Sequence, residues 1–237
     1  MDVNGLIKIG NNQSQCSSNI EGCLRYNSNL KNIEFCNGSN WLLLNVNNNS
    51  PSICYVTWSQ HDKAPNIVLS NNNLTIKSSE SWQSCRATLG KSSGRWYFEV
   101  LADVGPNGFN FVGVGKNTAP LDSIFCEGDG GWGYYGSMGD LRANNVNHDQ
   151  KGELFRDGKY IIGVAVDLDN GNIWWSLNGD WQLNGDPSTN INPTFSNLNG
   201  TVYPMSAVAL DNSTSTLYCC EIDFHNNLPD GFQPWSE

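Results

Sequence analysis

The sequence predicts an all-β protein: an antiparallel two-sheet β-sandwich preceded by a small disulfide-stapled β-hairpin module. Two observations support this fold class. Asn and Gly, which favour turns and disfavour helices, are abundant along the 237 residues, and no stretch shows a sustained apolar repeat of 3.6 residues. Short runs of alternating apolar and polar residues instead recur about every 10 to 20 residues up to Trp235, with turn sequences between them.

The chain is expected to have four parts. Residues 1–15 form a lead with one alternating strand, Gly5–Ile9, that anchors or oligomerises the protein. Residues 16–44 form the cysteine-containing hairpin module, with alternating runs at Cys23–Tyr26 and Asn32–Cys36 on either side of a polar turn. An Asn-rich linker at 45–56 then leads to the β-sandwich at 57–237.

The cysteines of the hairpin module predict a cross-link. A lone two-stranded hairpin is marginally stable in water, and Cys16 and Cys36 lie where a disulfide would join its ends. Closing a loop of this size stabilises a fold by about 3 kcal/mol, so we expect the Cys16–Cys36 disulfide. The alternative is two free thiols packed against Trp41. Cys23 then pairs with Cys54, pairs with another subunit, or stays free.

The strongest predicted strand of the sandwich is Gly94–Val104, in which every second residue from Trp96 is apolar. An Asp169-Asn170-Gly171 turn and an Asn178-Gly179 turn are strong hairpin signals because both positions tolerate positive φ. The other expected strands are Phe109–Gly115, Tyr160–Leu168, Asn172–Leu177, Val202–Leu210 and Thr216–Phe224. Within the last of these, the adjacent Cys219 and Cys220 should face opposite sides, with Cys220 in the core and Cys219 more available.

Several motifs then occur in a fixed order along the chain. They are GRWYFEV from Gly94, FVGVGK from Phe111, WGYY at Trp132–Tyr135, DGKYIIGVAVDLDNGNIWWSLNGDW from Asp157, VYP at 202–204, and LPDGFQPW ending at Trp235. Together they resemble the SPRY (B30.2-like) domain over about Thr57–Trp235. The opening segment Trp58–Ser70 and the tail Pro229–Trp235 resemble the bacteriophage and bacterial subtype of this domain.

The hairpin module resembles a second, shorter pattern found in phage tail-fibre-like and bacterial surface proteins. It consists of a cysteine, E-G-x-x-R-Y-N, a short turn, and L/I-E-x-C-x-G-x-x-W. Glu21, Arg25, Glu34 and Trp41 fit this pattern, whereas Cys23 departs from it because a small residue other than cysteine is usual there.

The SPRY resemblance implies a concanavalin-like jelly roll that binds proteins or peptides through loops at one end and is not an enzyme. The residues add no sign of catalysis or of a cofactor. None of His61, His148 and His225 has a metal-ligand spacing, and no G-x-S-x-G motif occurs. Asp167-Leu-Asp169-Asn-Gly171 looks like the start of a calcium loop, but Asn178 stands where the final carboxylate is needed. We therefore expect no metal and no cofactor.

Candidate ligand-binding residues come from the least regular loops, because loops on a rigid sandwich concentrate recognition residues. Trp174 is also included, since Trp174 and Trp175 face opposite sides and Ile173 and Leu177 place Trp175 inward. The candidate ligand-binding residues are Tyr134, Tyr135, Arg142, Asn144, His148 and Trp174.

The formal net charge of −10 argues against nucleic-acid partners, whose phosphates would repel the chain. No apolar run approaches a membrane span, and the start MDVNGLIKIG lacks the features of a signal peptide. The first hypothesis is a bacteriophage virion component (tail fibre, head or capsid decoration, or neck protein), assembled in the host cytoplasm and released by lysis. It would contact other virion proteins and recognise a host surface protein or glycan. A homo-oligomer such as a trimer is part of this hypothesis. The alternatives are an intracellular protein-interaction adaptor and, third, a lectin or carbohydrate-active protein.

Overall fold

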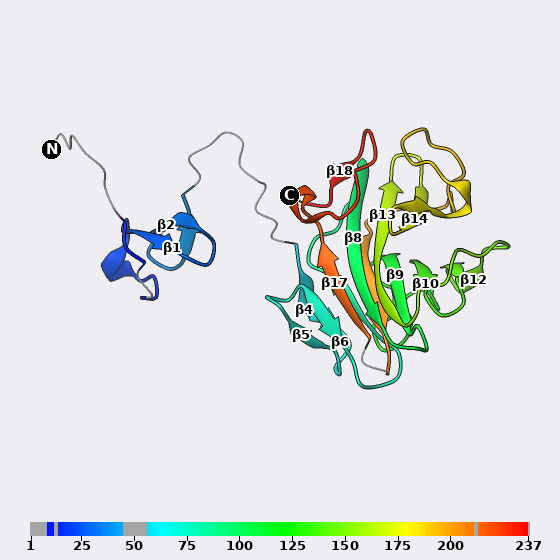
Figure 1. Cartoon of the computed structure of the whole chain (residues 1–237), viewed down its shortest axis with the longest axis horizontal. Coiled ribbons are helices and arrows are strands. Elements are labelled where there is room, and N and C mark those ends of the chain that lie inside the picture. Colours follow the sequence, from blue (N-terminus) through cyan, green and yellow to red (C-terminus); the bar gives the residue numbers. More distant parts are fainter. Residues whose placement is uncertain (1–8, 12–13, 45–55, 211–212, 237) are drawn as a thin grey trace. The chain divides into compact units, whose positions relative to one another are not determined.

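The computed structural model describes residues 9–11, 14–44, 56–210 and 213–236. The chain divides into two compact units between Pro51 and Ser52, and each is described by itself (Figure 1). Most of the expected lead strand Gly5–Ile9, most of the linker at 45–56, and Cys54 lie outside the described residues. Among those that are described, no helix is long and apolar enough to cross a membrane.

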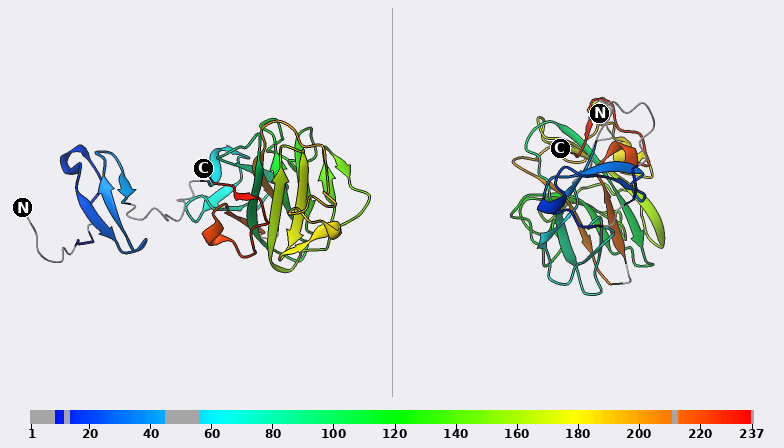
Figure 2. Two further views of the ribbon diagram at one scale, coloured as in Figure 1. Left: turned by 90° about the horizontal axis from the view of Figure 1, so that it is seen from above. Right: turned by 90° about the vertical axis from the view of Figure 1, so that its left-hand side faces the viewer.

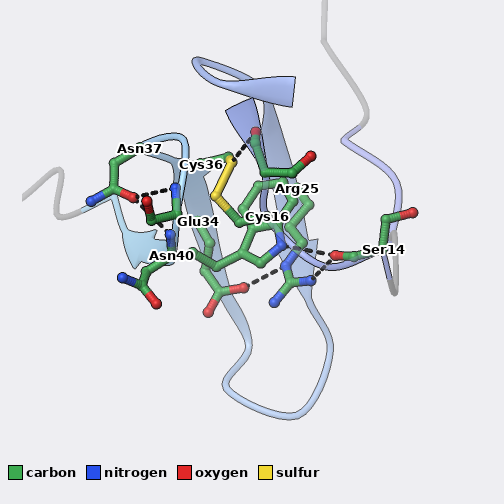
Figure 3. Close-up of a disulfide and its surroundings, with 10 residues drawn as sticks. Ser14, Cys16, Arg25, Glu34, Cys36, Asn37 and Asn40 are labelled. Carbon is green, nitrogen blue, oxygen red and sulfur yellow. Dashed lines mark hydrogen bonds and ion pairs between the residues drawn. A yellow bond between two sulfur atoms is a disulfide. The ribbon is translucent and has the colours of Figure 1, made fainter. Parts of the chain in front are cut away.

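The N-terminal unit is a three-stranded antiparallel sheet in the order β1-β2-β3. Its elements are the 3-10 helix η1 (Ser18–Ile20), β1 (Leu24–Asn27), β2 (Asn32–Cys36) and β3 (Trp41–Leu43). The two predicted strands are present, and β3 is an addition. Asn37 makes the turn into β3, because its Oδ1 accepts the backbone N–H groups of Ser39 and Asn40 at 3.1 and 2.7 Å (Figure 3).

The Cys16–Cys36 disulfide is confirmed, with a Cα–Cα distance of 5.4 Å. It closes one face of the small sheet together with a polar group of side chains (Figure 3). Arg25 pairs with Glu34 across the β1–β2 ladder at 2.7 Å and lies over the Trp41 ring at 4.2 Å. Arg25 and Trp41 both donate hydrogen bonds to the carbonyl oxygen of Ser14, so the segment that carries Cys16 is held along this face.

The free cysteines differ in environment. Cys23 is an exposed free thiol, so the structure does not contain the predicted Cys23–Cys54 pair. Cys85 and Cys126 are buried free thiols, and burial raises the pKa of each to about 12. Thiolate is the reactive form, so these two buried cysteines are chemically inert at neutral pH.

The larger unit is a β-sandwich of two antiparallel sheets that lie face to face (Figure 1, Figure 2). The seven-stranded sheet runs in the order β12 (Val146–Asn147), β11 (Leu141–Ala143), β10 (Gly131–Tyr135), β9 (Asn110–Gly115), β16 (Tyr203–Val208), β7 (Gln83–Ala87) and β4 (Trp58–Lys63). The eight-stranded sheet runs in the order β15 (Asp180–Trp181), β14 (Asn172–Leu177), β13 (Gly158–Asp167), β8 (Arg95–Val104), β17 (Thr214–Tyr218), β6 (Thr75–Lys77) and β5 (Val68–Ser70), and β18 (Gln233–Pro234) pairs with β8. Short 3-10 turns η2 (Gln182–Asn184) and η3 (Glu221–Asp223) follow β15 and β17. The predicted all-β sandwich is confirmed.

The inner faces of the two sheets form the main hydrophobic core. The alternation predicted for β8 holds, since Phe98, Val100 and Ala102 are fully buried there. Buried tryptophans fill much of the space, and each indole N–H finds an acceptor, as buried indoles require. Trp175 donates to the carbonyl oxygen of Val112 on the opposite sheet at 3.0 Å, which joins the two layers.

A second cluster covers the outer face of the eight-stranded sheet. Tyr97, Ala165, Trp174 and Phe232 are buried there. The prediction that Trp174 is exposed is therefore wrong: its ring packs edge-on against Phe232 at 6.3 Å, and only 1% of the residue is accessible. Residues from the C-terminal segment supply this cover.

The strand predicted at Thr216–Phe224 ends earlier, at Tyr218. As a result, the expectation that Cys219 is the more available of the two adjacent cysteines is wrong, and both are buried. Cys219 is buried in the core between the sheets, whereas Cys220 is disulfide-bonded and leads into η3. Strand alternation could not assign their faces because β17 ends at Tyr218 and both cysteines lie in the segment between β17 and η3.

Candidate functional site

One end of the seven-stranded sheet gathers segments that are far apart in sequence. Strands β7 and β9 begin there, and β10 and β16 end there. The register proves this placement, because Val208 pairs with both Asn110 and Gln83, and Tyr135 pairs with Phe111. Side chains at these strand ends therefore lie together on the outer face.

Four aromatic rings form a group at this end of the sheet. Trp82 contacts Phe109, Phe111 and Tyr135 edge-on, with ring centroids 5.4 to 5.6 Å apart. Phe111 and Tyr135 stack in parallel at 4.4 Å. Trp82 and Phe109 stay partly exposed above the buried rings. With Arg142, these four residues are called the aromatic surface below.

Arg142 adds a positive charge to the aromatic surface. Its guanidinium carbon lies 5.4 Å from the Phe111 ring centroid and 6.0 Å from that of Tyr135. One terminal nitrogen pairs with Asp140 at 3.1 Å, but the buried Nε has no hydrogen-bond partner among the described residues. The Arg142 side chain is still 20% exposed, and a partly exposed guanidinium held against aromatic rings is suited to recognise a carbonyl or carboxylate.

Asp140 holds Arg142 in place and is shared with a second cation. Lys151 Nζ lies 2.7 Å from Asp140 Oδ1, and Arg142 contacts Oδ2. Burial by itself would raise the pKa of Asp140, but the hydrogen bonds and charges of Lys151 and Arg142 outweigh it and hold the pKa below its ordinary value. The carboxylate therefore remains ionised and fixes the orientation of Arg142 at neutral pH.

Apolar side chains stand at the rim of the aromatic surface. Met138 is 53% exposed in the turn after β10, and Leu210 is 48% exposed after β16. Backbone hydrogen bonds tie both turns to the site, from Gly139 to the Tyr135 carbonyl and from Leu210 to the Glu80 carbonyl. Tryptophan, tyrosine and arginine are the residues enriched in protein-binding hot spots, and methionine is enriched at interfaces, so this composition favours protein binding.

The structure brings together only two of the six predicted ligand-binding residues, Tyr135 and Arg142. Tyr134 is fully buried in the inter-sheet core, and burial raises the pKa of its hydroxyl, so a loop-surface role is wrong. Asn144 has a positive φ of 51° and accepts the Gly130 N–H, which makes it a turn residue. Trp174 lies on the opposite sheet under the C-terminal segment.

His148 lies apart from the aromatic surface, in a hollow of about 340 Å³ that includes Gln150, Asn184 and Asn192. Its ring meets Phe195 edge-on at 5.5 Å. Among the described residues, no group of three or more His, Cys, Asp or Glu side chains could hold a metal ion.

Sequence reasoning missed Trp82, Phe109, Met138 and Leu210. Trp82 and Phe109 each stand directly before a strand, and Leu210 follows one. The available signal was a bulky apolar side chain next to the end of a predicted strand. The residues that such a side chain contacts lie in segments about 30 to 130 residues apart, and local patterns do not reveal these contacts.

Comparison with known proteins gives the family. The model of the SPRY domain matches residues 95–221, more than half of the chain. The chain belongs to the SPRY domain family. The match includes β8 to β17 and thus most of the aromatic surface, although Trp82 lies before it. SPRY domains mediate protein–protein interactions, which agrees with the composition of this surface.

Several animal proteins are similar to this SPRY domain. The Ran-binding proteins 9/10 homolog of Drosophila melanogaster is 29% identical over 131 residues, which cover 52% of this chain and 14% of that protein. Human Ran-binding protein 9 is 28% identical over 132 residues, covering 52% and 18%. The ATP-dependent RNA helicase DDX1 of Xenopus laevis is 30% identical over 124 residues, covering 50% and 15%. The shared region is thus less than a fifth of each of these relatives.

Among solved structures, the SPRY domain of human HERC1 has the same fold, with a TM-score of 0.57 at 16% identity. It covers 71% of this chain and 99% of that one. These comparisons support neither the bacteriophage and bacterial subtype nor the cysteine hairpin motif, since the relatives described are eukaryotic and the family match begins at residue 95.

Proposed function

We propose that this protein is a non-enzymatic protein-interaction adaptor and that its aromatic surface binds the partner. The observation that carries the proposal is the partly exposed Arg142 guanidinium held against the stacked Phe111 and Tyr135 rings. The exposed part of this guanidinium can donate charge-assisted hydrogen bonds to a partner's carbonyl or carboxylate. The partly exposed Trp82 and the apolar rim at Met138 and Leu210 would supply the contact area around it.

The eukaryotic relatives favour the adaptor over the virion component. Ran-binding proteins 9 and 10 and HERC1 carry SPRY domains similar to this one. A virion role, host-glycan recognition and a trimeric state remain hypotheses from the sequence alone, with no support from the comparisons. The lectin alternative makes a distinct prediction, namely binding on a glycan array.

We also propose the four-part organisation expected from the sequence, with the lead at 1–15, the hairpin module at 16–44, the linker at 45–56 and the sandwich at 57–237. The burial of Val56 and Trp58 in the inter-sheet core supports a sandwich that begins close to residue 57. The Cys16–Cys36 disulfide and the Arg25–Glu34 pair support a module that holds itself together.

The proposed function is tested by selecting peptides from a random display library on the full chain and measuring their affinity for variants. Met138→Asp and Arg142→Ala should each weaken binding about tenfold. The first places a charge in the apolar rim, and the second removes the cation beside the aromatic rings. Val68→Asp is the matched control, since Val68 is 63% exposed on the other sheet. Peptides that bind all three variants equally well would refute the assignment of binding to the aromatic surface. Binding or hydrolysis of glycans on an array would favour a lectin or carbohydrate-active protein.

A further inference from the structure

A second site lies on the outer face of the eight-stranded sheet, away from the aromatic surface. A pocket of about 420 Å³ opens there beside the C-terminal segment. Its lining includes Tyr97, Ser176, Gly179, Trp181, His225 and Asn226. These residues come from β8, β14, β15, the turn between β14 and β15, and the segment after η3. The pocket is therefore assembled by the fold, and no local sequence motif encodes it.

A buried carboxylate lies beneath this pocket. Glu99 is 0% exposed and accepts hydrogen bonds from the Tyr97 hydroxyl at 2.9 Å and from the backbone N–H groups of His225 and Asn226 at 2.7 and 2.9 Å. The Asn226 amide adds a further hydrogen bond at 3.0 Å. This ring of donors solvates the carboxylate in place of water, which allows a charged group to stay inside the protein.

Among the residues that the structure describes, no lysine or arginine forms an ion pair with Glu99. Its recorded ion-pair partner is the imidazole of His225, with Nδ1 at 3.3 Å from Oε2. Burial raises the pKa of the Tyr218 hydroxyl, and the negative charges of Asp223 and Glu99 raise it further. The pocket therefore has a negative electrostatic potential that would attract a cation.

An unused hydroxyl faces the same pocket. Ser176 is 1% exposed, and its Oγ lies close to the Tyr97 hydroxyl. That hydroxyl donates to Glu99, so no donor among the described residues occupies the lone pairs of Ser176 Oγ. Asn226 Oδ1 points toward Gly179, since its amide nitrogen is committed to Glu99. Two oxygen atoms thus stand at the wall of the pocket, ready to accept hydrogen bonds from a donor that enters it.

Trp181 completes the wall with a partly exposed ring, which meets Tyr97 edge-on at 6.3 Å. An aromatic face next to a buried negative charge favours organic cations over small metal ions, because the ring and the apolar stem of the ligand also interact. The volume suits one side chain rather than a whole peptide.

We propose that this pocket binds an arginine or lysine side chain of a partner protein. The cationic head would lie above Glu99 and donate to Ser176 Oγ and Asn226 Oδ1, while the stem packs along Trp181. The site is independent of the aromatic surface, so loss of either one leaves the other intact.

The test compares two peptides of nearly identical shape by NMR titration of the full chain. The probes are acetyl-Gly-Arg-Gly-amide and the same peptide with citrulline, which keeps the urea-like head but lacks the charge. We expect the arginine peptide to shift the Trp181 indole signal and to bind about fivefold more tightly than the citrulline peptide. Equal affinities, or no shift of the Trp181 signal at about 10 mM arginine peptide, would overturn the proposal.

A pair of variants locates the binding. Ser176→Ala removes a hydroxyl that makes no hydrogen bond, so the melting temperature should not fall, whereas arginine binding should weaken about threefold. Thr194→Val is the matched control, because Thr194 Oγ1 is also buried without a partner but lies outside the pocket. If both variants weaken arginine binding equally, the pocket is not the site.

Discussion

At the residue scale, the orientation of Arg142 depends on one buried carboxylate. Asp140 is 4% exposed and receives Arg142 and Lys151 on its two oxygens. Since its own ionisation is favoured by these two cations against the effect of burial, the pKa of Asp140 is lower in the folded chain than in the unfolded chain. Folding is thus linked to the charge of this group.

The linkage gives a pH-dependent prediction for Asp140→Asn. The stabilisation by the ionised carboxylate is fully present above the unfolded pKa of about 4 and is lost as the pH falls through the lower, folded pKa. The variant should therefore be less stable than the wild type by about 1 kcal/mol at pH 7, and the difference should shrink below pH ~4. Urea unfolding across this range measures it, and a constant difference down to pH ~2 would contradict the linkage.

At the element scale, the three-stranded sheet of the N-terminal unit depends on its cross-link. The sheet has one face closed by the disulfide segment and another on which Leu24, Tyr26 and Leu42 are 36% to 47% exposed. Little apolar area is therefore buried within this unit, and the constraint on the unfolded chain must supply most of the stability.

Reduction of the disulfide, or a Cys16→Ser/Cys36→Ser double substitution, should unfold this sheet. The cysteines are 20 residues apart, and a loop of that size is worth about 3 kcal/mol. Hydrogen exchange should show the backbone amide at position 36, which donates to the Cys23 carbonyl in the folded sheet, exchanging at the unfolded rate. The amides of β8 serve as the internal control, and protection of β2 that survives in the double variant would show that the disulfide is dispensable.

The strands were predictable where the pattern is local. The period-2 alternation of β8 and the Asn178-Gly179 turn, with φ of 51° and 93°, are visible in a few adjacent residues. β3 was not predicted because the apolar run at Trp41–Leu43 does not alternate. The cover over Trp174 was not predicted because it comes from Phe232, 58 residues further along the chain.

The same reasoning explains the outcome for the candidate sites. Tyr135 and Arg142 lie close in sequence and on neighbouring strands, so one loop region suggested both. Their partners Trp82 and Phe109 come from other strand ends, and only the register of the sheet brings them together. The pocket above Glu99 uses the face of β8 opposite the apolar one, and alternation alone does not show that other segments cover that face.

At the scale of the whole molecule, the C-terminal segment is part of the sandwich. β18 pairs in parallel with β8, and Trp235 is fully buried against Phe98 in the inter-sheet core, with its indole N–H bonded to the Leu89 carbonyl at 3.0 Å. The same segment places Phe232 over Trp174 and provides His225 to the pocket. Folding of the core and formation of the pocket are therefore coupled through one stretch of chain.

Trp235→Ala tests this coupling. Loss of a fully buried tryptophan should lower the free energy of unfolding of the sandwich by about 3 to 5 kcal/mol, because a cavity remains beside Phe98. Ile222→Ala is the control in the same segment, since Ile222 is 73% exposed and its loss should cost less than about 0.5 kcal/mol. Urea unfolding followed by tryptophan fluorescence compares the two variants. Similar unfolding midpoints for Trp235→Ala and the wild type would mean that the C-terminal segment does not contribute to the stability of the core. Formation of the pocket would then not be coupled to folding of the core.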